Sequence, residues 1–253
     1  MVLPIKDENP TRSRPLLTLL IIVACVYAFF GVQPPAGSEE ELGFLYENAA
    51  IPCEVTHGDA MSPRLFVECD DQEELSDLRA ALILRDPQAG QEFYPDKNVW
   101  FSLLASMFLH GSIVHLGGNM LFLWIFGNNI EDRFGKVGYL LLYGITGVGA
   151  TLAHVFSQPE STIPLIGASG AIAGVMGAYL VYFPRARILT VLPFFLFVHL
   201  PAYVVLAGWF VLQFFTNPNT GVAAMAHIGG FVLGAAIAGG VRLVSGGERA
   251  VYP

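Results

Sequence analysis

The chain has 253 residues, of which 54% are hydrophobic and only 13% are charged, and its net charge is −8. A soluble domain has about 25% charged residues, so this composition excludes an ordinary soluble globular protein. The mean hydropathy is +0.55, and the negative net charge argues against a nucleic-acid partner. The composition therefore predicts an all-α polytopic membrane protein.

Six apolar stretches follow one another, at residues 16–33, 99–130, 137–156, 163–183, 188–215 and 222–244. About 20 helical residues cross the bilayer core, so we expect six transmembrane helices. The second stretch would reach about 48 Å as one helix, which is too long for a single span. We expect it to break near Gly111 and Ser112, with a helix from Ile113. Pro193 and Pro201 predict that the fifth stretch starts non-helically or with a kink.

The basic residues predict the orientation of these helices. Nine of the 13 Lys and Arg residues fall on one side of the six spans, namely Lys6, Arg12, Arg14, Arg133, Lys136, Arg185, Arg187, Arg242 and Arg249. The short loops 157–162 and 216–221 on the other side contain none. Because basic loops stay in the cytoplasm, we expect a cytoplasmic tail 1–15, a membrane domain 16–245 and a cytoplasmic tail 246–253.

The segment 34–98, called the insert below, is polar and acidic and is expected on the extracytoplasmic side. It holds 15 of the 21 acidic residues and four basic ones. Residues 68–85 predict an amphipathic helix, which lies on the protein or membrane surface or is part of a solvated cap. An oxidising compartment would permit a disulfide between Cys53 and Cys69, and the sequence leaves open whether it forms. We find no metal-ligand spacing.

Polar side chains at membrane depth are costly and are functional candidates by default. The candidates are His110, His115, Asn119, His154, Ser169, His199, Gln213 and His227. Ser169 and His227 lie about 9 Å and 8 Å into their stretches if these are helical from their outer ends. His115 and Asn119 are one helical turn apart in the outer half of the second span. Four polar groups from three helices are therefore expected in one layer.

Small residues predict that the helices of Ser169 and His227 approach closely. They recur every fourth position in both stretches, at Gly170, Gly174 and Ala178 and at Ala226, Gly230, Gly234 and Ala238. Such stripes allow backbone contact within lipid. Packing of the stripes would bring the Ser169 hydroxyl near the His227 imidazole, the base that a serine nucleophile needs.

Each feature also has an ordinary structural interpretation. A serine in a transmembrane helix usually bonds its own helix, and small-residue stripes are common packing devices. We interpret His154 and His199 as packing residues and His110 as a tie for the preceding loop. Glu131 and Arg133 read as a capping or loop-bonding pair at the inner end of the second span.

Three motifs together resemble the rhomboid family of intramembrane serine proteases: His110-x4-His115-x3-Asn119, Gly167-Ala168-Ser169-Gly170 and His227-x2-Gly230-x3-Gly234. The resemblance covers approximately residues 99–240, with a compatible first span. It implies a six-helix rhomboid bundle with an extracytoplasmic loop after the first helix.

The resemblance also implies the roles of the site residues. Ser169 would be the nucleophile and His227 the general base, without a third acidic member. The Ser169 backbone N–H, His115 and Asn119 would form the oxyanion hole. Structural support is implied for His110, Gly167, Gly170, Gly230 and Gly234. No metal or organic cofactor is implied, the substrates would be transmembrane proteins in the lipid bilayer, and the fifth span would be their lateral gate.

One departure and two alternative functions remain. The family often has an aromatic residue four positions after the serine, where this chain has Ala173. A catalytically weak or inactive relative that binds membrane clients is the first alternative, and a small-molecule transporter is the second. The first residues show no organelle-type presequence, which favours a bacterial plasma membrane. The oligomeric state is not predicted.

Overall fold

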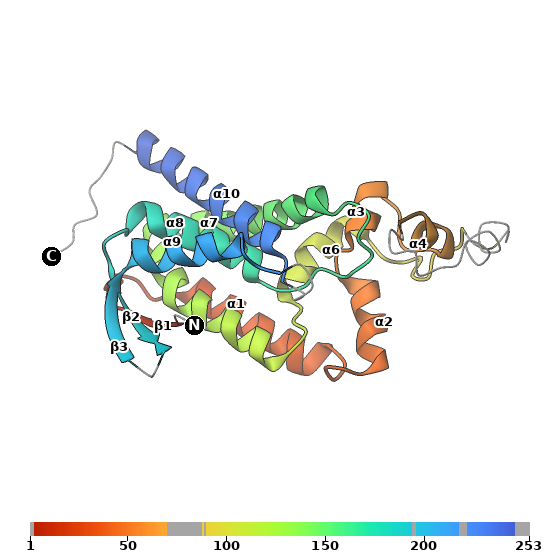
Figure 1. The fold of residues 1–253 in the computed structure, drawn as a ribbon, viewed down its shortest axis with the longest axis horizontal. Helices are drawn as coiled ribbons and strands as arrows, with labels where there is room; N and C mark the ends of the chain where they lie inside the picture. Colours follow the sequence, from red (N-terminus) through yellow and green to blue (C-terminus); the bar gives the residue numbers. More distant parts are fainter. Residues whose placement is uncertain (1–2, 70–87, 89, 194–195, 218–221, 246–253) are drawn as a thin grey trace.

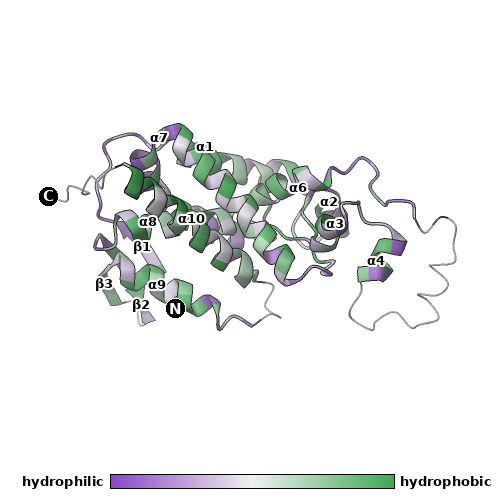
Figure 2. Cartoon of the chain, turned by 90° about the horizontal axis from the view of Figure 1, so that it is seen from above, coloured by the Kyte–Doolittle hydropathy of each residue, from purple (hydrophilic) through white to green (hydrophobic). Residues whose placement is uncertain are grey.

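The computed structural model describes residues 3–69, 88, 90–193, 196–217 and 222–245. These residues form a helical bundle with a small sheet at one end and the insert at the other (Figure 1). Apolar residues dominate the bundle helices, as Figure 2 shows. The bundle helices are α1 (Leu16–Tyr27), α7 (Ile113–Ser157), α8 (Ser169–Tyr182), α9 (Ala202–Gln213) and α10 (Ala224–Val244).

Two of these helices, α7 and α10, are long and apolar enough to cross a membrane. Helix α7 is two helices in sequence, because Gly135 has φ 68° and interrupts the helical backbone. The second and third apolar stretches are therefore separate helical segments joined at this glycine. Helix α1 continues into a short π-helical turn, η1 (Ala28–Val32).

The predicted break in the second apolar stretch is confirmed. Helix α6 (Val99–Ala105) and a 3₁₀ turn, η2 (Ser106–Phe108), precede the break, and α7 begins at Ile113. The Ser112 hydroxyl caps α7 by accepting a hydrogen bond from the His115 backbone N–H at 3.1 Å. Such a cap satisfies a donor that the first helical turn leaves unpaired.

The prediction of an all-α fold is wrong at one end of the bundle. Strands β1 (Leu3–Asp7), β2 (Arg187–Leu192) and β3 (Leu196–Pro201) form an antiparallel sheet in the order β1-β2-β3. The predicted tail 1–15 thus contributes a strand. The sheet forms because Pro201 disfavours a helix before α9 and because the β-branched residues of β2 suit a half-buried strand.

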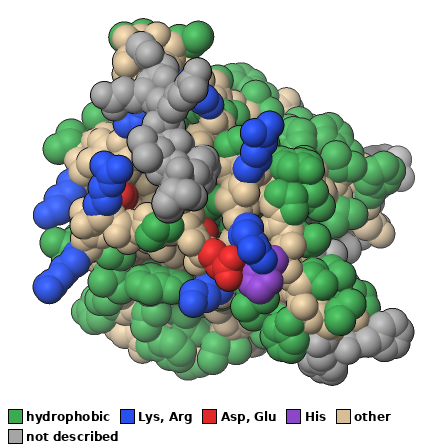
Figure 3. All heavy atoms as spheres, turned by 90° about the vertical axis from the view of Figure 1, so that its left-hand side faces the viewer, with side chains coloured by type: hydrophobic (Ala, Val, Ile, Leu, Met, Phe, Trp, Pro, Cys, Tyr) green, Lys and Arg blue, Asp and Glu red, His purple; other side chains and the backbone are tan. Residues whose placement is uncertain are grey.

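The sheet end of the molecule gathers basic side chains around a small ionic cluster (Figure 3). His199 lies on β3, outside the helices, and its Nε2 is 2.9 Å from a Glu8 carboxylate oxygen. Arg187 pairs with the same carboxylate at 3.5 Å. The interpretation of His199 as a packing residue at membrane depth is therefore wrong.

Helix α1 is fixed to the bundle by a buried carboxylate on α7. Glu131 accepts hydrogen bonds from the backbone N–H groups of Leu17 and Thr18, at 2.9 and 2.8 Å, and from the Thr18 hydroxyl at 2.8 Å. A negative charge is favourable at a helix N-terminus, where N–H groups lack partners. The capping role predicted for Glu131 is confirmed, whereas Arg133 stacks on the Tyr182 ring.

The insert contains α2 (Glu39–Asn48), α3 (Pro52–His57) and α4 (Pro63–Cys69). A disulfide joins Cys53 to Cys69. Lys97 and Glu54 form a buried ion pair at 2.5 Å. Burial raises the pKa of Glu54 and lowers the pKa of Lys97. Residues 70–85 of the amphipathic helix predicted over 68–85 lie outside the described residues.

Helices α8 and α10 touch through their backbones at the predicted glycine stripes. A Cβ atom built on Gly230 would collide with the Gly170 carbonyl oxygen, and one on Gly234 would collide with that of Gly174. A Cβ atom on Gly177 would likewise collide with the Phe231 carbonyl oxygen. The predicted close approach of the two stripes is therefore confirmed.

This contact predicts an effect of Gly234→Ala on stability. The added methyl group has no space, and overpacking of this kind costs about 1–3 kcal/mol. We expect a lower unfolding temperature in detergent. Gly240→Ala is the matched control, because nothing lies within 4 Å of a Cβ atom there. An unchanged unfolding temperature for Gly234→Ala would contradict the backbone contact.

Asp7 predicts a pH dependence of stability. Its carboxylate accepts hydrogen bonds from Asn129 Nδ2 at 2.5 Å and the Tyr179 hydroxyl at 2.8 Å. Burial raises its pKa from 3.8 to about 6. The folded state thus binds this proton more strongly than the unfolded state does. The contribution of Asp7 to the stability of the fold therefore falls as pH rises from about 4 to about 6.

We expect Asp7→Asn to remove this part of the pH dependence, which amounts to at most about 3 kcal/mol. The measurement is the unfolding temperature across this pH range for the wild type and the variant. Glu92→Gln, at an exposed position in the insert, is the control. Parallel wild-type and Asp7→Asn curves would show that Asp7 does not titrate in this way.

Candidate active site

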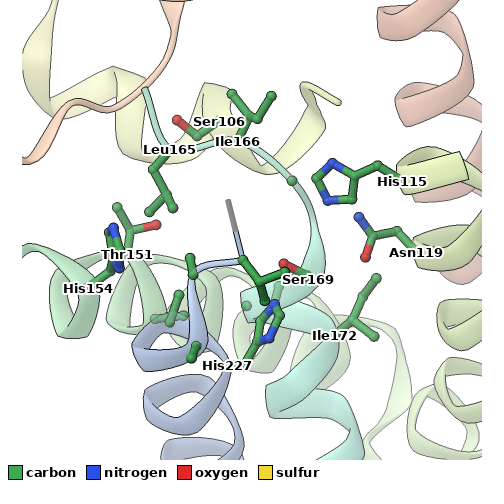
Figure 4. Close-up of a pocket in the computed structure, with 18 of the residues that line it drawn as sticks. Ser106, His115, Asn119, Thr151, His154, Leu165, Ile166, Ser169, Ile172 and His227 are labelled. Carbon is green, nitrogen blue, oxygen red and sulfur yellow. The ribbon is translucent and has the colours of Figure 1, made fainter. Parts of the chain in front are cut away.

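A cavity of about 940 Å³ lies among α7, α8 and α10. Figure 4 shows side chains that project into it from these three helices. The predicted residues His115, Asn119, Ser169 and His227 all line it. The structure therefore brings together the four polar groups that the sequence expects in one layer.

Ser169 is the first residue of α8, so residues 163–168 of the fourth apolar stretch precede the helix. Pro164 lacks a backbone donor, and Gly167 has φ +118°, so residues 163–168 run outside the helix. The N–H groups of the first turn of α8 have no partner within the helix. The serine hydroxyl therefore stands beside a set of backbone donors that can bind an oxyanion.

Gly167 is closely covered by the side chains of His115 and Asn119. A Cβ atom built on Gly167 would lie 2.8 Å from His115 Nε2 and 3.6 Å from Asn119 Nδ2. Asn119 Nδ2 is buried, and it has no hydrogen-bond partner among the residues that the structure describes. An amide donor of this kind, beside the start of α8, is suited to bind a developing negative charge.

The segment before Ser169 is held by Ser106, which sequence reasoning does not single out. The Ser106 carbonyl oxygen accepts a hydrogen bond from the Gly167 N–H at 2.9 Å. Its hydroxyl accepts one from the Ala50 N–H at 2.6 Å. Ala50 also forms a β-bridge with Leu165. The insert is thus bonded directly to the segment that positions the serine.

Ser169 and His227 project into the same part of the cavity (Figure 4). Ser169 directly precedes Gly170, and His227 directly follows Ala226. Gly170 and Ala226 are the first residues of the two small-residue stripes. His227 is in the first turn of α10, which begins at Ala224. The backbone contact between α8 and α10 is therefore what brings the hydroxyl and the imidazole together.

The His227 ring is held by two residues of α9. Gln213 Oε1 lies 2.7 Å from His227 Nδ1. The Trp209 ring centroid lies 5.5 Å from that of His227, with the planes inclined at 40°. Trp209 thus provides the aromatic contact that Ala173 cannot. From the sequence, Gln213 is a polar candidate without a role, and Trp209 is not singled out. Their spacing of four residues, one helical turn, is the signal that could have indicated a shared face toward His227.

The other histidines occupy different positions. His110 is fully buried, and its backbone N–H and carbonyl both bond the Gln33 side chain at 3.0 Å. This arrangement ties the loop down, as the sequence predicts. His154 lines the cavity on the side away from His115 and Asn119, rather than packing between helices (Figure 4).

The described residues contain one group of His, Cys, Asp and Glu close enough to hold a metal ion, formed by Cys53, His57 and Cys69. The disulfide joins the two sulfur atoms of this group. A cysteine binds a metal ion as a thiolate, and the sulfur atoms of a disulfide are not thiolates. This group lies in the insert, outside the residues that line the cavity.

Comparisons with known proteins agree with the geometry. A family model described as the rhomboid domain matches residues 97–243. The chain is 31% identical over 153 residues to rhomboid protease AarA of Providencia stuartii, covering 54% of each chain.

Similarity extends to organellar proteins. The chain is 37% identical over 82 residues to rhomboid-like protein 11, chloroplastic, of Arabidopsis thaliana, covering 32% of this chain and 29% of that one. It is 35% identical over 92 residues to rhomboid protein 1, mitochondrial, of Saccharomyces cerevisiae, covering 35% and 27%. The chain thus spans about half the length of the first of these relatives and less than a third of the other two. On the rhomboid-domain match, which covers more than half of its residues, this chain belongs to the rhomboid family.

Proposed function

We propose that the protein is an intramembrane serine endopeptidase that cleaves peptide bonds in or near transmembrane segments of other proteins. The observation that carries this proposal is the meeting of Ser169 and His227 in one cavity, beside the unpaired N–H groups of α8. The name of the relative AarA, a rhomboid protease, supports the same reaction class.

The proposed reaction follows serine-protease chemistry. The His227 imidazole takes the proton of the Ser169 hydroxyl, whose oxygen attacks the scissile carbonyl carbon. The imidazolium then gives this proton to the leaving amine as the peptide C–N bond breaks. A water molecule then attacks the acyl-enzyme carbonyl carbon while His227 takes its proton. The ester C–O bond breaks as His227 gives that proton to the Ser169 oxygen, which releases the acid product and restores the serine.

The tetrahedral intermediate carries a negative oxygen that needs donors. The Ser169 backbone N–H, the His115 ring and Asn119 Nδ2 surround the position next to Gly167 where such an oxygen would lie. Donors fixed in advance stabilise this charge without reorganising, and one of them is often worth about 3 kcal/mol. These residues therefore form the proposed oxyanion hole.

The proposed membrane arrangement has six spans: α1, the two halves of α7, α8, α9 and α10. Helix α8 has 14 residues and is about 21 Å long, shorter than the bilayer core of about 30 Å. In this arrangement its first residue, Ser169, lies below the membrane surface, and the cavity admits water to it. The basic sheet end in Figure 3 is assigned to the cytoplasm.

The insert then lies on the extracytoplasmic side. An oxidising space, such as the bacterial periplasm, would maintain the Cys53–Cys69 disulfide there. We accordingly assign the protein to a bacterial plasma membrane. Its partners in this proposal are transmembrane protein substrates and the surrounding lipid.

The first test is labelling of the detergent-solubilised protein with a fluorophosphonate probe, which reacts with activated serines. We expect labelling of the wild type and none of Ser169→Ala or His227→Ala, because the first lacks the nucleophile and the second lacks its base. Ser157→Ala, which removes a different hydroxyl from the cavity lining, should be labelled like the wild type.

Absence of labelling in a folded wild type would contradict the protease proposal. It would favour the alternative, a rhomboid-like protein that binds membrane clients without cleaving them. Cleavage of a transmembrane model substrate by the wild type, and not by Ser169→Ala, would extend the labelling result to peptide hydrolysis.

Asn119→Leu tests the oxyanion hole separately. It removes the unpaired amide donor and keeps a side chain of similar size, so we expect a 10²- to 10³-fold loss of kcat, about 3–4 kcal/mol. The measurement is steady-state cleavage of the same model substrate. The control is the unfolding temperature. A folded variant with unchanged kcat would exclude Asn119 from this role.

A further inference from the structure

The residue that holds His227 comes from a third helix. Gln213 is at the end of α9, is 8% exposed, and places Oε1 2.7 Å from His227 Nδ1. The nucleophile is on α8 and the imidazole on α10, so α9 adds a further polar group to the proposed site. The resemblance to the family implies a dyad of Ser169 and His227 and assigns no hydrogen-bond partner to the imidazole.

The orientation of the Gln213 amide is determined by a second hydrogen bond. Gln213 Nε2 donates to the Trp209 carbonyl oxygen at 3.1 Å. A carbonyl oxygen can only accept, so the amide nitrogen must face it. The amide oxygen therefore faces His227.

This orientation determines which nitrogen of the imidazole carries the proton. An amide oxygen cannot donate, so His227 Nδ1 must be the donor in the 2.7 Å contact. A neutral imidazole has only one N–H group, and its Nε2 then has a free lone pair. That nitrogen is the one that can accept the proton of the Ser169 hydroxyl.

We propose that Gln213 is a positioning residue of the proposed protease site, which holds His227 in the Nδ1–H tautomer from helix α9. In a soluble serine protease a buried carboxylate has this role, and an amide in its place can turn and stabilise the wrong tautomer. Here the Trp209 carbonyl prevents that rotation. A neutral partner also avoids burying a charge at membrane depth. The inference rests on the proposed function.

The hydrogen bond between Gln213 and His227 makes the geometry of the site depend on the position of α9. Helix α9 packs on α10 through aromatic contacts, with the Phe210 and Phe231 rings stacked at 4.7 Å, while Val204, Val211 and Leu212 on its other side are exposed. If α9 moves away from α10, His227 loses its acceptor and its aromatic neighbour together. The competent imidazole is therefore coupled to the docked position of α9.

The tautomer is tested by NMR of the full-length protein with ¹⁵N-labelled histidine in detergent, at about pH 8, where a free imidazole is neutral. The ring nitrogen shifts distinguish Nδ1–H from Nε2–H, and a His227→Gln spectrum identifies the signals of this residue. We expect Nδ1–H in the wild type and in Gln213→Glu, and its loss in Gln213→Met. A wild-type His227 with Nε2–H would overturn the proposal.

Labelling by the fluorophosphonate probe gives the second readout. We expect Gln213→Met to be labelled about tenfold to a thousandfold more slowly than the wild type. Gln213→Glu keeps an acceptor oxygen and should restore at least tenfold over Gln213→Met. Leu212→Met, an exposed neighbour on α9, is the control and should match the wild type.

Equal labelling rates for Gln213→Met and the wild type would overturn the proposal, as would equally slow Gln213→Glu and Gln213→Met variants. The two proposals fail in distinguishable ways. An unlabelled wild type would reject the protease function, whereas the NMR spectrum reports on the Gln213–His227 bond in either case.

Discussion

The contact between the backbones of α8 and α10 is the constraint on which the rest of the structure depends. Gly170, Gly174, Gly230 and Gly234 have no side chains, so the two helices approach until carbonyl groups lie where Cβ atoms would be. Within lipid there is little hydrophobic force to drive helices together, and packing of this closeness supplies the attraction instead. The close contact also fixes the positions of the residues beside it, and this explains how the two helices can place the Ser169 hydroxyl and the His227 imidazole in the same cavity.

Much of this site could be predicted from the sequence because its signals are local. Small residues at a spacing of four identify the packed faces, and the positions of Ser169 and His227 beside those faces follow directly. The break before Ile113 could be predicted because a helix of 32 residues exceeds the bilayer. Each of these arguments needs only one element and its length.

Other features depend on contacts that a local pattern does not encode. Strand β1 pairs with β2 about 180 residues further along the chain, and a short apolar run such as 188–201 cannot be assigned to strand or helix by periodicity alone. The role of Gln213 depends on how α9 is rotated toward α10, which a single polar residue in an apolar helix does not specify.

The hydrogen bonds around Ser106 divide the insert into two parts, which differ in how far their sequence can be altered. Residues 49–53 bond the Ser106 hydroxyl, Leu165 and Ser161, so they belong to the frame that holds the serine loop. Elsewhere in the insert, the Thr56 hydroxyl donates to the Pro159 carbonyl oxygen, and the Asn98 side chain caps α6 by accepting a hydrogen bond from the Phe101 N–H. A shortened or exchanged insert would therefore need to retain residues 49–53, while its outer part offers a position for grafting a different domain.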